Sequence, residues 1–475
     1  MMPLKKTFVL LLIFLSTASF AQKNKKDVIK AIDTKYDQYA TIAKTIWDYA
    51  EVGFQETKSS ALLQETLSAS GFKIDKSVAG MPTAFVASYG SGKPVIGILG
   101  EFDALPGVAQ QAVPTKTPIE GQVAGHACGH HLFGTASSAA AIAIKDWMAA
   151  NKKQGTIRFY GTPAEEGGSG KVYMVREGLF KDVDAVINWH PGPANSASPG
   201  NSLANKTGKF RFYGVAAHAA AAPHRGRSAL DGVEAMDVMV NMMREHVTSE
   251  TRIHYVITRG GEAPNVVPAF AEVYYYVRHP DRSEVKDVWE RIVNAAKGAA
   301  LGTDTKVEYE ITGGVHDLLP NETLAKAMHA NLVEVGGYSL TEEETKFALE
   351  IQKSFTGKAP SLKITEEIAP YQLREGSAST DVGDVSWVVP TVGMSAATWV
   401  PGTAGHSWQA VAAGGTTIGM KGMMIAAKSM ALMGIDLFSN PTLLTEAWNE
   451  FKVKTEGFTY EALIGDRAPA LDYRK

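Results

Sequence analysis

The sequence predicts an α/β protein, in which a mixed, mostly parallel sheet flanked by helices forms a larger domain and a smaller βαββαβ domain interrupts it. Three observations support this fold class. Apolar runs of strand length alternate with helical patterns in the first half of the chain, as in sheets whose parallel strands are joined by helices. Residues 207–316 instead show the order strand, helix, strand, strand, helix, strand. The alternation then resumes after residue 316.

The first part of the larger domain is expected at residues 22–206. Apolar side chains at helical spacing predict a helical region over residues 34–70. A small, apolar stretch at residues 135–150 predicts a helix buried against the sheet. The apolar or alternating runs that predict strands are 85–90, 95–102, 156–163 and 185–190.

The smaller domain, residues 207–316, is expected to be a single sheet with two helices on one face. Its predicted strands are 208–219, 251–258, 271–279 and 305–312, and its predicted helices are 226–247 and 283–299. The second part of the larger domain follows at residues 317–475, with predicted helices at 321–336 and 414–434. Residues 440–475 predict one more helix and an irregular end, to which the sequence assigns no function.

The N-terminus has the layout of a secretory signal. Two lysines precede an apolar run at residues 8–15, and small residues follow at Ser19 and Ala21, so cleavage is expected after Ala21. The apolar run is too short to span a bilayer. The sequence therefore predicts a periplasmic or secreted protein without a membrane span, and the alternative is a buried N-terminal helix.

The charge and cysteine content narrow the possible functions. The formal net charge is −3 and no basic run is present, which argues against a nucleic-acid partner. Cys128 is the only cysteine, although exported proteins normally pair their cysteines. Because Cys128 cannot pair within its own chain, it is a core residue, a nucleophile or a metal ligand.

Side chains suited to catalysis or metal binding gather where the predicted strands end. In an open α/β sheet, ligands bind at the carboxyl ends of the strands. The side chains that follow a predicted strand or precede the predicted helix at 135–150 are Asp103, Cys128, His130, Glu165, Glu166 and His190. Any one of these has an ordinary structural explanation, such as a turn or a helix start. Their common position favours a shared site.

A metal centre explains this set of side chains. Thiolate, imidazole and carboxylate are the usual ligands of zinc, and the last two also suit other divalent ions. The adjacent Glu165 and Glu166 cannot easily point the same way, so one can bind metal while the other removes a proton from a metal-activated water. The alternative is that Cys128 is a nucleophile with a histidine base, but this leaves the glutamate pair and His190 without a function.

Several motifs together give the chain a family resemblance. It resembles the dinuclear-metal amidohydrolases of the aminoacylase and glutamate carboxypeptidase superfamily, and within it the aminobenzoyl-glutamate hydrolase branch. Plant auxin-conjugate hydrolases and bacterial hippurate hydrolases are more distant. The motifs, which cover nearly the whole chain in order, are GHACGHHLFGT, TPAEEGGSGK, NWHPG, GVAAHAAAAPHRGRSALD, GEAPNVVP, STDVGDVSW and GTAGHSW.

The resemblance implies two divalent metal ions, zinc or manganese, and assigns roles to individual residues. The implied metal ligands are Cys128, His130, Glu166, His190 and His406, with Cys128 as our choice for the bridging ligand. Glu165 matches the general base, and Asp103 matches the acid that ends the early strand near the metal site.

The inserted domain matches a lid that also mediates dimerisation in relatives. The resemblance therefore implies a homodimer in which His218 and Asn265 reach into the partner's active site. His218 would polarise the carbonyl or stabilise the oxyanion. Arg278 matches the arginine that binds the substrate carboxylate, a role for which a planar guanidinium is suited.

The chain departs from the commoner family pattern at His131, where an acid usually follows the histidine ligand. An acid at this position would orient the histidine ligand or balance its charge, and a histidine cannot do so as an anion. The metal affinity or metal choice is therefore expected to differ from that of the commoner pattern. His131 is also itself a candidate ligand. The aminobenzoyl-glutamate branch also lacks this acid. Its known member is a cytoplasmic enzyme built from two kinds of chain, so a hetero-oligomer is an alternative to the homodimer.

The expected function is metal-dependent hydrolysis of an amide bond next to a free carboxylate, with release of an amino acid such as glutamate. Candidate substrates are aminobenzoyl-glutamate, N-acyl amino acids and dipeptides. Two alternatives remain open: a non-catalytic metal-binding receptor or scaffold, and an amidase with Cys128 as nucleophile. The presence of Glu165 argues against the receptor, because a binding protein has no use for a base.

Overall fold

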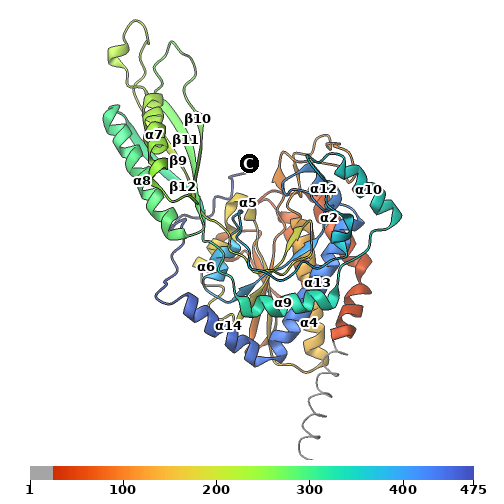
Figure 1. Cartoon of the computed structure of the whole chain (residues 1–475). Coiled ribbons are helices and arrows are strands. Elements are labelled where there is room, and N and C mark those ends of the chain that lie inside the picture. The colour runs from red at the N-terminus through yellow and green to blue at the C-terminus, as the bar shows by residue number, and fades with distance from the viewer. Residues whose placement is uncertain (1–24, 475) are drawn as a thin grey trace, which may run out of the picture.

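The computed structural model describes residues 25–474. A larger α/β domain carries a narrower lid that projects from one side (Figure 1). The predicted signal peptide lies outside the described residues and stays a prediction.

The larger domain is built on a six-stranded sheet. Its order is β1-β2-β6-β3-β7-β13, in which β6, β3, β7 and β13 are parallel neighbours while β1 and β2 pair antiparallel. This confirms the mixed, mostly parallel sheet. The strands are β1 (Lys73–Lys76), β2 (Phe85–Ser91), β3 (Val95–Gly100), β6 (Gly155–Gly161), β7 (Ala185–Ile187) and β13 (Thr391–Val392).

Both faces of this sheet are covered, and the central strand β3 is apolar throughout as a result. Ile96 and Ile98 pack into the core on one face, while Val95 and Leu99 pack into the core on the other. The helices around the sheet are α2 (Tyr36–Tyr49), α3 (Thr57–Ala69), α4 (His130–Ala150), α9 (Glu322–Val335) and α13 (Thr417–Ser439) on the first face, and α6 (Gly170–Arg176) and α11 (Val382–Ser386) on the second. Further α-helices of this domain are α5 (Glu165–Gly168), α10 (Glu342–Gln352), α12 (Trp408–Gly414) and α14 (Pro441–Lys454).

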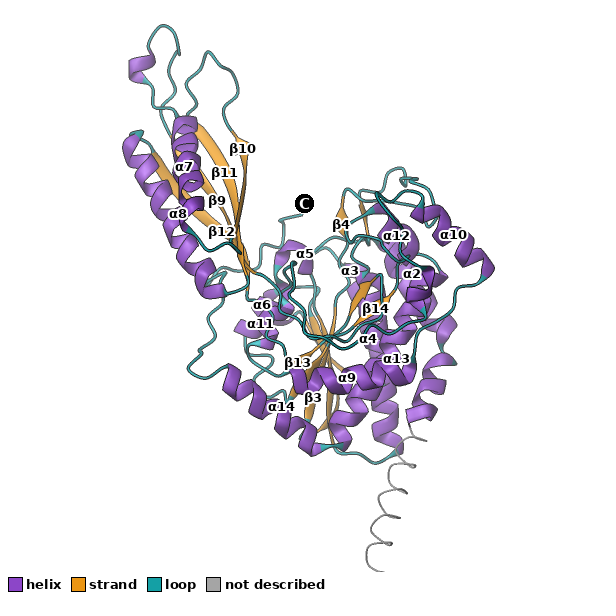
Figure 2. Cartoon of the chain, in the orientation of Figure 1, coloured by secondary structure: helices purple, strands orange, loops and turns teal. Residues whose placement is uncertain are grey.

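Helix α13 is long and apolar enough to cross a membrane by length and composition, but 83% of its most apolar window is buried inside the protein. It packs along α4, whose small side chains allow close approach (Figure 2). The composition of α13 is therefore that of a core helix.

Two predicted elements of the larger domain are divided in the structure. The helical region at 34–70 is two helices, because Ala50 ends α2 in a left-handed conformation with φ 43° and a short loop precedes α3. The strand at 185–190 ends at Ile187. His190 begins a separate strand, β8 (His190–Gly192), which pairs in parallel with β14 (Ser395–Ala397). A further pair, β4 (Leu105–Pro106) and β5 (Ala124–Gly125), is antiparallel.

The lid has the predicted βαββαβ order. Its antiparallel sheet runs β10-β11-β9-β12, and two helices cover one face (Figure 2). Helix α7 starts three residues later than Gly226, because the Ser228 hydroxyl caps it by accepting from the Asp231 N–H. The elements are β9 (Ala204–Tyr213), α7 (Ala229–Met243), β10 (Arg252–Arg259), β11 (Phe270–His279), α8 (Arg282–Gly302) and β12 (Lys306–Val315).

Candidate metal centre

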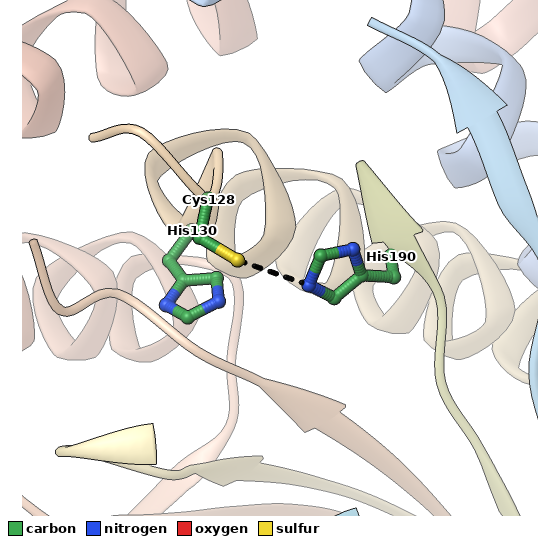
Figure 3. Close-up of side chains that lie close together, drawn as sticks. All are labelled: Cys128, His130 and His190. Atoms are coloured by element: carbon green, nitrogen blue, oxygen red, sulfur yellow. Dashed lines mark hydrogen bonds between the residues drawn. The ribbon is translucent and has the colours of Figure 1, made fainter. Parts of the chain in front are cut away.

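Five side chains from distant parts of the sequence meet beyond the carboxyl ends of the parallel strands. They form two groups, and within each group the donor atoms all lie within 4.8 Å of one another. One group is Cys128, His130 and His190, which Figure 3 shows, and the other is Cys128, Glu166 and His406. Cys128 is common to both. The sulfur of Cys128 lies 3.3 Å from Nε2 of His190.

A glycine turn aims Cys128 and His130 at the same place. Gly129 adopts a left-handed conformation with φ 77° at the start of α4, which side chains other than glycine rarely adopt. A Cβ at this position would lie 2.7 Å from Cβ of Pro191, the residue that follows His190. The turn and the strand β8 can therefore pack closely only because residue 129 is glycine.

The adjacent glutamates diverge, as the metal hypothesis requires. The Ala164 residue before them has φ 56°, and its N–H donates to the buried Glu56 carboxylate at 2.8 Å. Oε1 of Glu166 lies 3.2 Å from Nε2 of His406. Glu165 instead falls in a third cluster with Glu101 and His130.

Backbone hydrogen bonds and the Asp103 carboxylate hold His406, His130 and Glu166 in place. His406 has φ 58°, and its N–H donates to the carbonyl of Ala127 at 3.0 Å. Oδ1 of Asp103 lies 2.8 Å from Nδ1 of His130, and Oδ2 accepts from the N–H of Glu166 at 2.9 Å. One buried carboxylate thus orients two of the candidate ligands, as outer-shell partners commonly do.

Three charged residues next to the cluster were not singled out from the sequence. Lys171 is fully buried, and its Nζ lies 2.7 Å from carboxylate oxygens of both Glu101 and Asp381. Oε2 of Glu101 lies 3.0 Å from Nε2 of His130. Glu101 was detectable, because it alternates with Asp103 at a strand end and so lies on the same side.

The donor set fits divalent cations. Among the described residues, Nε2 of His130, Oε1 of Glu166 and Oε2 of Glu101 are buried atoms without a hydrogen-bond partner of good geometry. Burial strongly raises the pKa of the Cys128 thiol, so a thiolate at this position requires a cation beside it. Burial and the charges of Glu101 and Glu166 raise the pKa of Glu165 well above the usual range.

His131 belongs to a different environment. Its Nε2 lies 3.0 Å from the carbonyl oxygen of Gly414 at the end of α12, and its ring packs 4.9 Å from that of His126. Burial lowers the pKa of His131 to about 3, so the ring is neutral. The structure therefore places His131 outside the clusters, where it anchors the helix that follows His406.

The three predicted functional residues of the lid lie in two different environments. A pocket of about 840 Å³ extends from the clusters to the root of the lid, and Arg278 lines it. His218 and Asn265 are exposed on loops of the lid, where the Ala219 N–H donates to the carbonyl of Asn265 at 3.0 Å. Nδ1 of His218 accepts from the N–H groups of Ala220 and Ala221. Neither residue lines the pocket of its own chain.

The comparisons with known proteins agree with this fold. Residues 97–362 match the model of peptidase family M20/M25/M40. The chain is 43% identical over 464 residues to the B subunit of p-aminobenzoyl-glutamate hydrolase from Escherichia coli (strain K12), covering 91% of this chain and 96% of that protein. It is 27% identical over 456 residues to the Xaa-Arg dipeptidase of Mus musculus, covering 93% and 95% of the two chains.

Two solved structures share the fold. The aminobenzoyl-glutamate utilization protein from Klebsiella pneumoniae superposes with a TM-score of 0.61 at 17% identity, covering 86% of this chain and 97% of that one. A Bacillus subtilis protein described as a dinuclear metal binding peptidase superposes with a TM-score of 0.55 at 16% identity, covering 86% and 99%. Fold and site define a metal-dependent amidohydrolase. The chain belongs to peptidase family M20/M25/M40.

Proposed function

We propose that this enzyme hydrolyses the amide bond of an N-acyl amino acid next to its free carboxylate, with aminobenzoyl-glutamate as the favoured substrate and dipeptides as further candidates. The observation that carries the proposal is the pair of donor groups that share Cys128 beside Glu165, at the end of a pocket lined by Arg278. The 43% identity to one chain of a p-aminobenzoyl-glutamate hydrolase supports this choice of acyl group.

The protein's own residues have separate tasks in this reaction. Cys128, His130 and His190 would hold one divalent cation, and Cys128, Glu166 and His406 the other, with zinc or manganese as the ion. When bound, the cations supply Lewis acidity to a water and to the scissile carbonyl. Glu165 accepts a proton from the attacking water and passes it to the leaving nitrogen. Arg278 binds the substrate carboxylate through its guanidinium.

A second copy of the chain would complete the site. His218 and Asn265 are exposed on the lid, as is required of residues that reach a neighbouring protomer. The lid also exposes apolar side chains on α7 and on the edge strand β10, including Val238, Met242 and Val256. A homodimer formed through the lid would cover them. The alternative is a hetero-oligomer, because the Escherichia coli relative is one of the differently named chains of its hydrolase. We also propose export, based on the N-terminal sequence.

Replacement of Glu165 tests the proposed reaction. We expect Glu165→Gln to lower kcat for aminobenzoyl-glutamate by about 10²–10⁴-fold, because proton transfer by a positioned side chain contributes about that factor. Metal content, measured by mass spectrometry, should stay at the parental value. Glu177→Gln, at an exposed glutamate after α6, is the matched control. A Glu165→Gln enzyme as fast as the parent would refute the role of Glu165.

Inhibitors separate this function from the two alternatives. A chelator should abolish hydrolysis, and added zinc or manganese should restore it. A thiol alkylator should leave the metal-loaded enzyme active, because Cys128 is buried. Inhibition by the alkylator with no effect of the chelator would favour the cysteine nucleophile. Metal binding without hydrolysis of any acyl amino acid or dipeptide would favour the receptor.

A further inference from the structure

Residues 455–474, which we call the strap, connect α14 to the metal centre across the root of the lid. The Tyr460 hydroxyl donates to Asp384 at 2.8 Å, and the carbonyl of Glu461 lies 2.9 Å from Nε2 of His316. Farther along, Nη1 of Arg467 donates to the carbonyl of Ile311 in β12. The chain then turns back toward the larger domain and ends beside α5 (Figure 1). These contacts fix the strap to α11 and to the end of β12 at the lid's root.

The end of the strap contacts the loop that carries the two glutamates. The Tyr473 hydroxyl donates to the carbonyl oxygen of Glu166 at 3.0 Å, and Nη2 of Arg474 donates to the same oxygen at 2.8 Å. The Tyr473 ring packs edge-on against Phe54. A Cβ at Gly53 would lie 2.2 Å from the Tyr473 oxygen, so glycine at this position leaves room for the phenol. The strap therefore seats Arg474 beside the metal centre.

Arg474 lines the same pocket as Arg278, and one donor of each side chain has no acceptor among the described residues. Nε of Arg278 and Nε of Arg474 are both buried without a hydrogen-bond acceptor in the described part of the chain. Neither arginine forms an ion pair with a described carboxylate. Both lie near Tyr276. Burial raises the pKa of that phenol, and the charges of Arg278 and Arg474 oppose the shift.

Two guanidiniums with free donors suit a substrate that carries two carboxylates. The nearby acids Glu165, Glu166 and Glu101 belong to the candidate metal centre, so they are not available as counter-ions within the pocket. A substrate with a single carboxylate would satisfy Arg278 and leave Arg474 unpaired. A buried guanidinium gains most from a charged acceptor held by paired N–H donors.

We propose that Arg474 binds the second carboxylate of the substrate, so that the enzyme prefers acyl amino acids whose released amino acid is dicarboxylic. This inference rests on the proposed amide hydrolysis and adds to it the residue that recognises the second carboxylate. Arg474 is then a specificity-determining residue, supplied by the strap and separate from the lid arginine.

A pair of isosteric substrates tests the proposal with the full-length, metal-loaded enzyme. We expect Arg474→Met to lower kcat/KM for p-aminobenzoyl-glutamate by about 10–100-fold, mainly through KM, because a hydrogen bond to a charged group is lost. For p-aminobenzoyl-glutamine the loss should be below about 3-fold, since its side chain has no charge to pair. Lys452→Met, which removes an exposed cation of α14 outside the pocket and the strap, should leave the ratio of the two substrates unchanged.

Equal losses for both substrates would overturn the proposal and leave Arg474 as a residue that only positions Glu166. No loss for either would also overturn it. Arg474→Lys guards against misfolding, because it retains the charge but not the paired donors. Its kcat/KM for p-aminobenzoyl-glutamate should lie between the values of the parent and of Arg474→Met. Its kcat/KM for p-aminobenzoyl-glutamine should match the parent's. Each variant is first compared with the parent in Tm and metal content.

Equilibrium binding separates this inference from the proposed function. Calorimetry should show that the parent binds free glutamate more tightly than free glutamine. Arg474→Met should weaken the binding of glutamate at least about 10-fold and leave the binding of glutamine unchanged. If the parent hydrolyses neither substrate, the proposed function fails but the glutamate titration still reports on Arg474. If the parent hydrolyses and binds both equally well, amide hydrolysis stands and the dicarboxylic preference is wrong.

Discussion

The metal centre and the lid loops hold their functional residues in opposite ways. At the metal centre, Cys128 and His130 are buried and fixed by a glycine turn, and Asp103 holds two neighbouring groups at once. On the lid, His218 and Asn265 are exposed, and their hydrogen bonds among the described residues are to backbone groups of the two lid loops. The centre is thus organised within a single chain, whereas the lid residues have no site in their own chain.

This difference follows from what each group has to do. Donors that hold cations must converge before the metal binds, which requires burial and a supporting network of charges and hydrogen bonds. A residue that serves another protomer must be solvent-exposed in the isolated chain. Damage to the centre should therefore reduce stability and metal binding, whereas damage to the lid loops should reduce turnover alone.

The largest expected effect comes from the charge network under the metal centre. Lys171→Met removes the cation that lies 2.7 Å from both Glu101 and Asp381, in a fully buried position. The two carboxylates would then be buried without the cation that they share, and we expect a loss of about 3–5 kcal/mol in the free energy of unfolding at neutral pH. Urea denaturation measures this change.

Lys93→Met is the matched control, because Lys93 forms an exposed ion pair with Asp184 at 2.9 Å. Its loss should stay below about 1 kcal/mol. Similar losses for the two variants would contradict the view that the centre depends on its buried network.

The next effect concerns the lid. His218→Ala should lower kcat by about 10²–10³-fold, the factor typical of removing one oxyanion donor, with no change in Tm or metal content. His224→Ala, at a neighbouring exposed histidine, serves as the control. Mixed dimers of His218→Ala and Glu165→Gln should regain activity, because one of their two sites combines an intact Glu165 with the partner's intact His218. No recovery on mixing would place His218 outside the partner's site.

The fold was largely predictable because its signals are local and periodic. The continuous apolar run of β3 and the small, apolar composition of α4 are visible in single windows of sequence. The division between α2 and α3 was missed, because Ala50 adopts its left-handed conformation without the glycine that usually marks such a break.

The site was predictable only where a side chain follows a regular element. Cys128, Glu165 and His190 lie at the ends of predicted strands or at a helix start, whereas His406 lies on an irregular loop and entered through the family resemblance alone. The contact between Lys171 and Asp381 joins residues 210 positions apart, which leaves no periodic pattern. The strap has neither helix nor strand, so Arg474 had no signal before its neighbours were known.

The smallest expected effect tests whether the lid is stabilised independently of the metal centre. Asp237 in α7 is buried and accepts a hydrogen bond from the Tyr275 hydroxyl of β11. Burial raises the pKa of Asp237 to about 6 from an ordinary value near 4. The folded lid therefore retains a proton that the unfolded chain releases. The stability contributed by this proton is complete below about pH 4 and is lost as the pH rises through about 6.

Asp237→Asn replaces the protonated acid by a neutral isostere, so it should avoid this loss. Between pH 5 and pH 8, the free energy of unfolding of the variant should rise relative to the parent by about 1 kcal/mol, as measured by urea denaturation at both values. Glu234→Gln, an exposed position one turn away on α7, should show no such dependence. Metal content should be parental in both variants. A change in metal content with Asp237→Asn would mean that the lid core and the centre are coupled, and that the two regions are not separately stabilised.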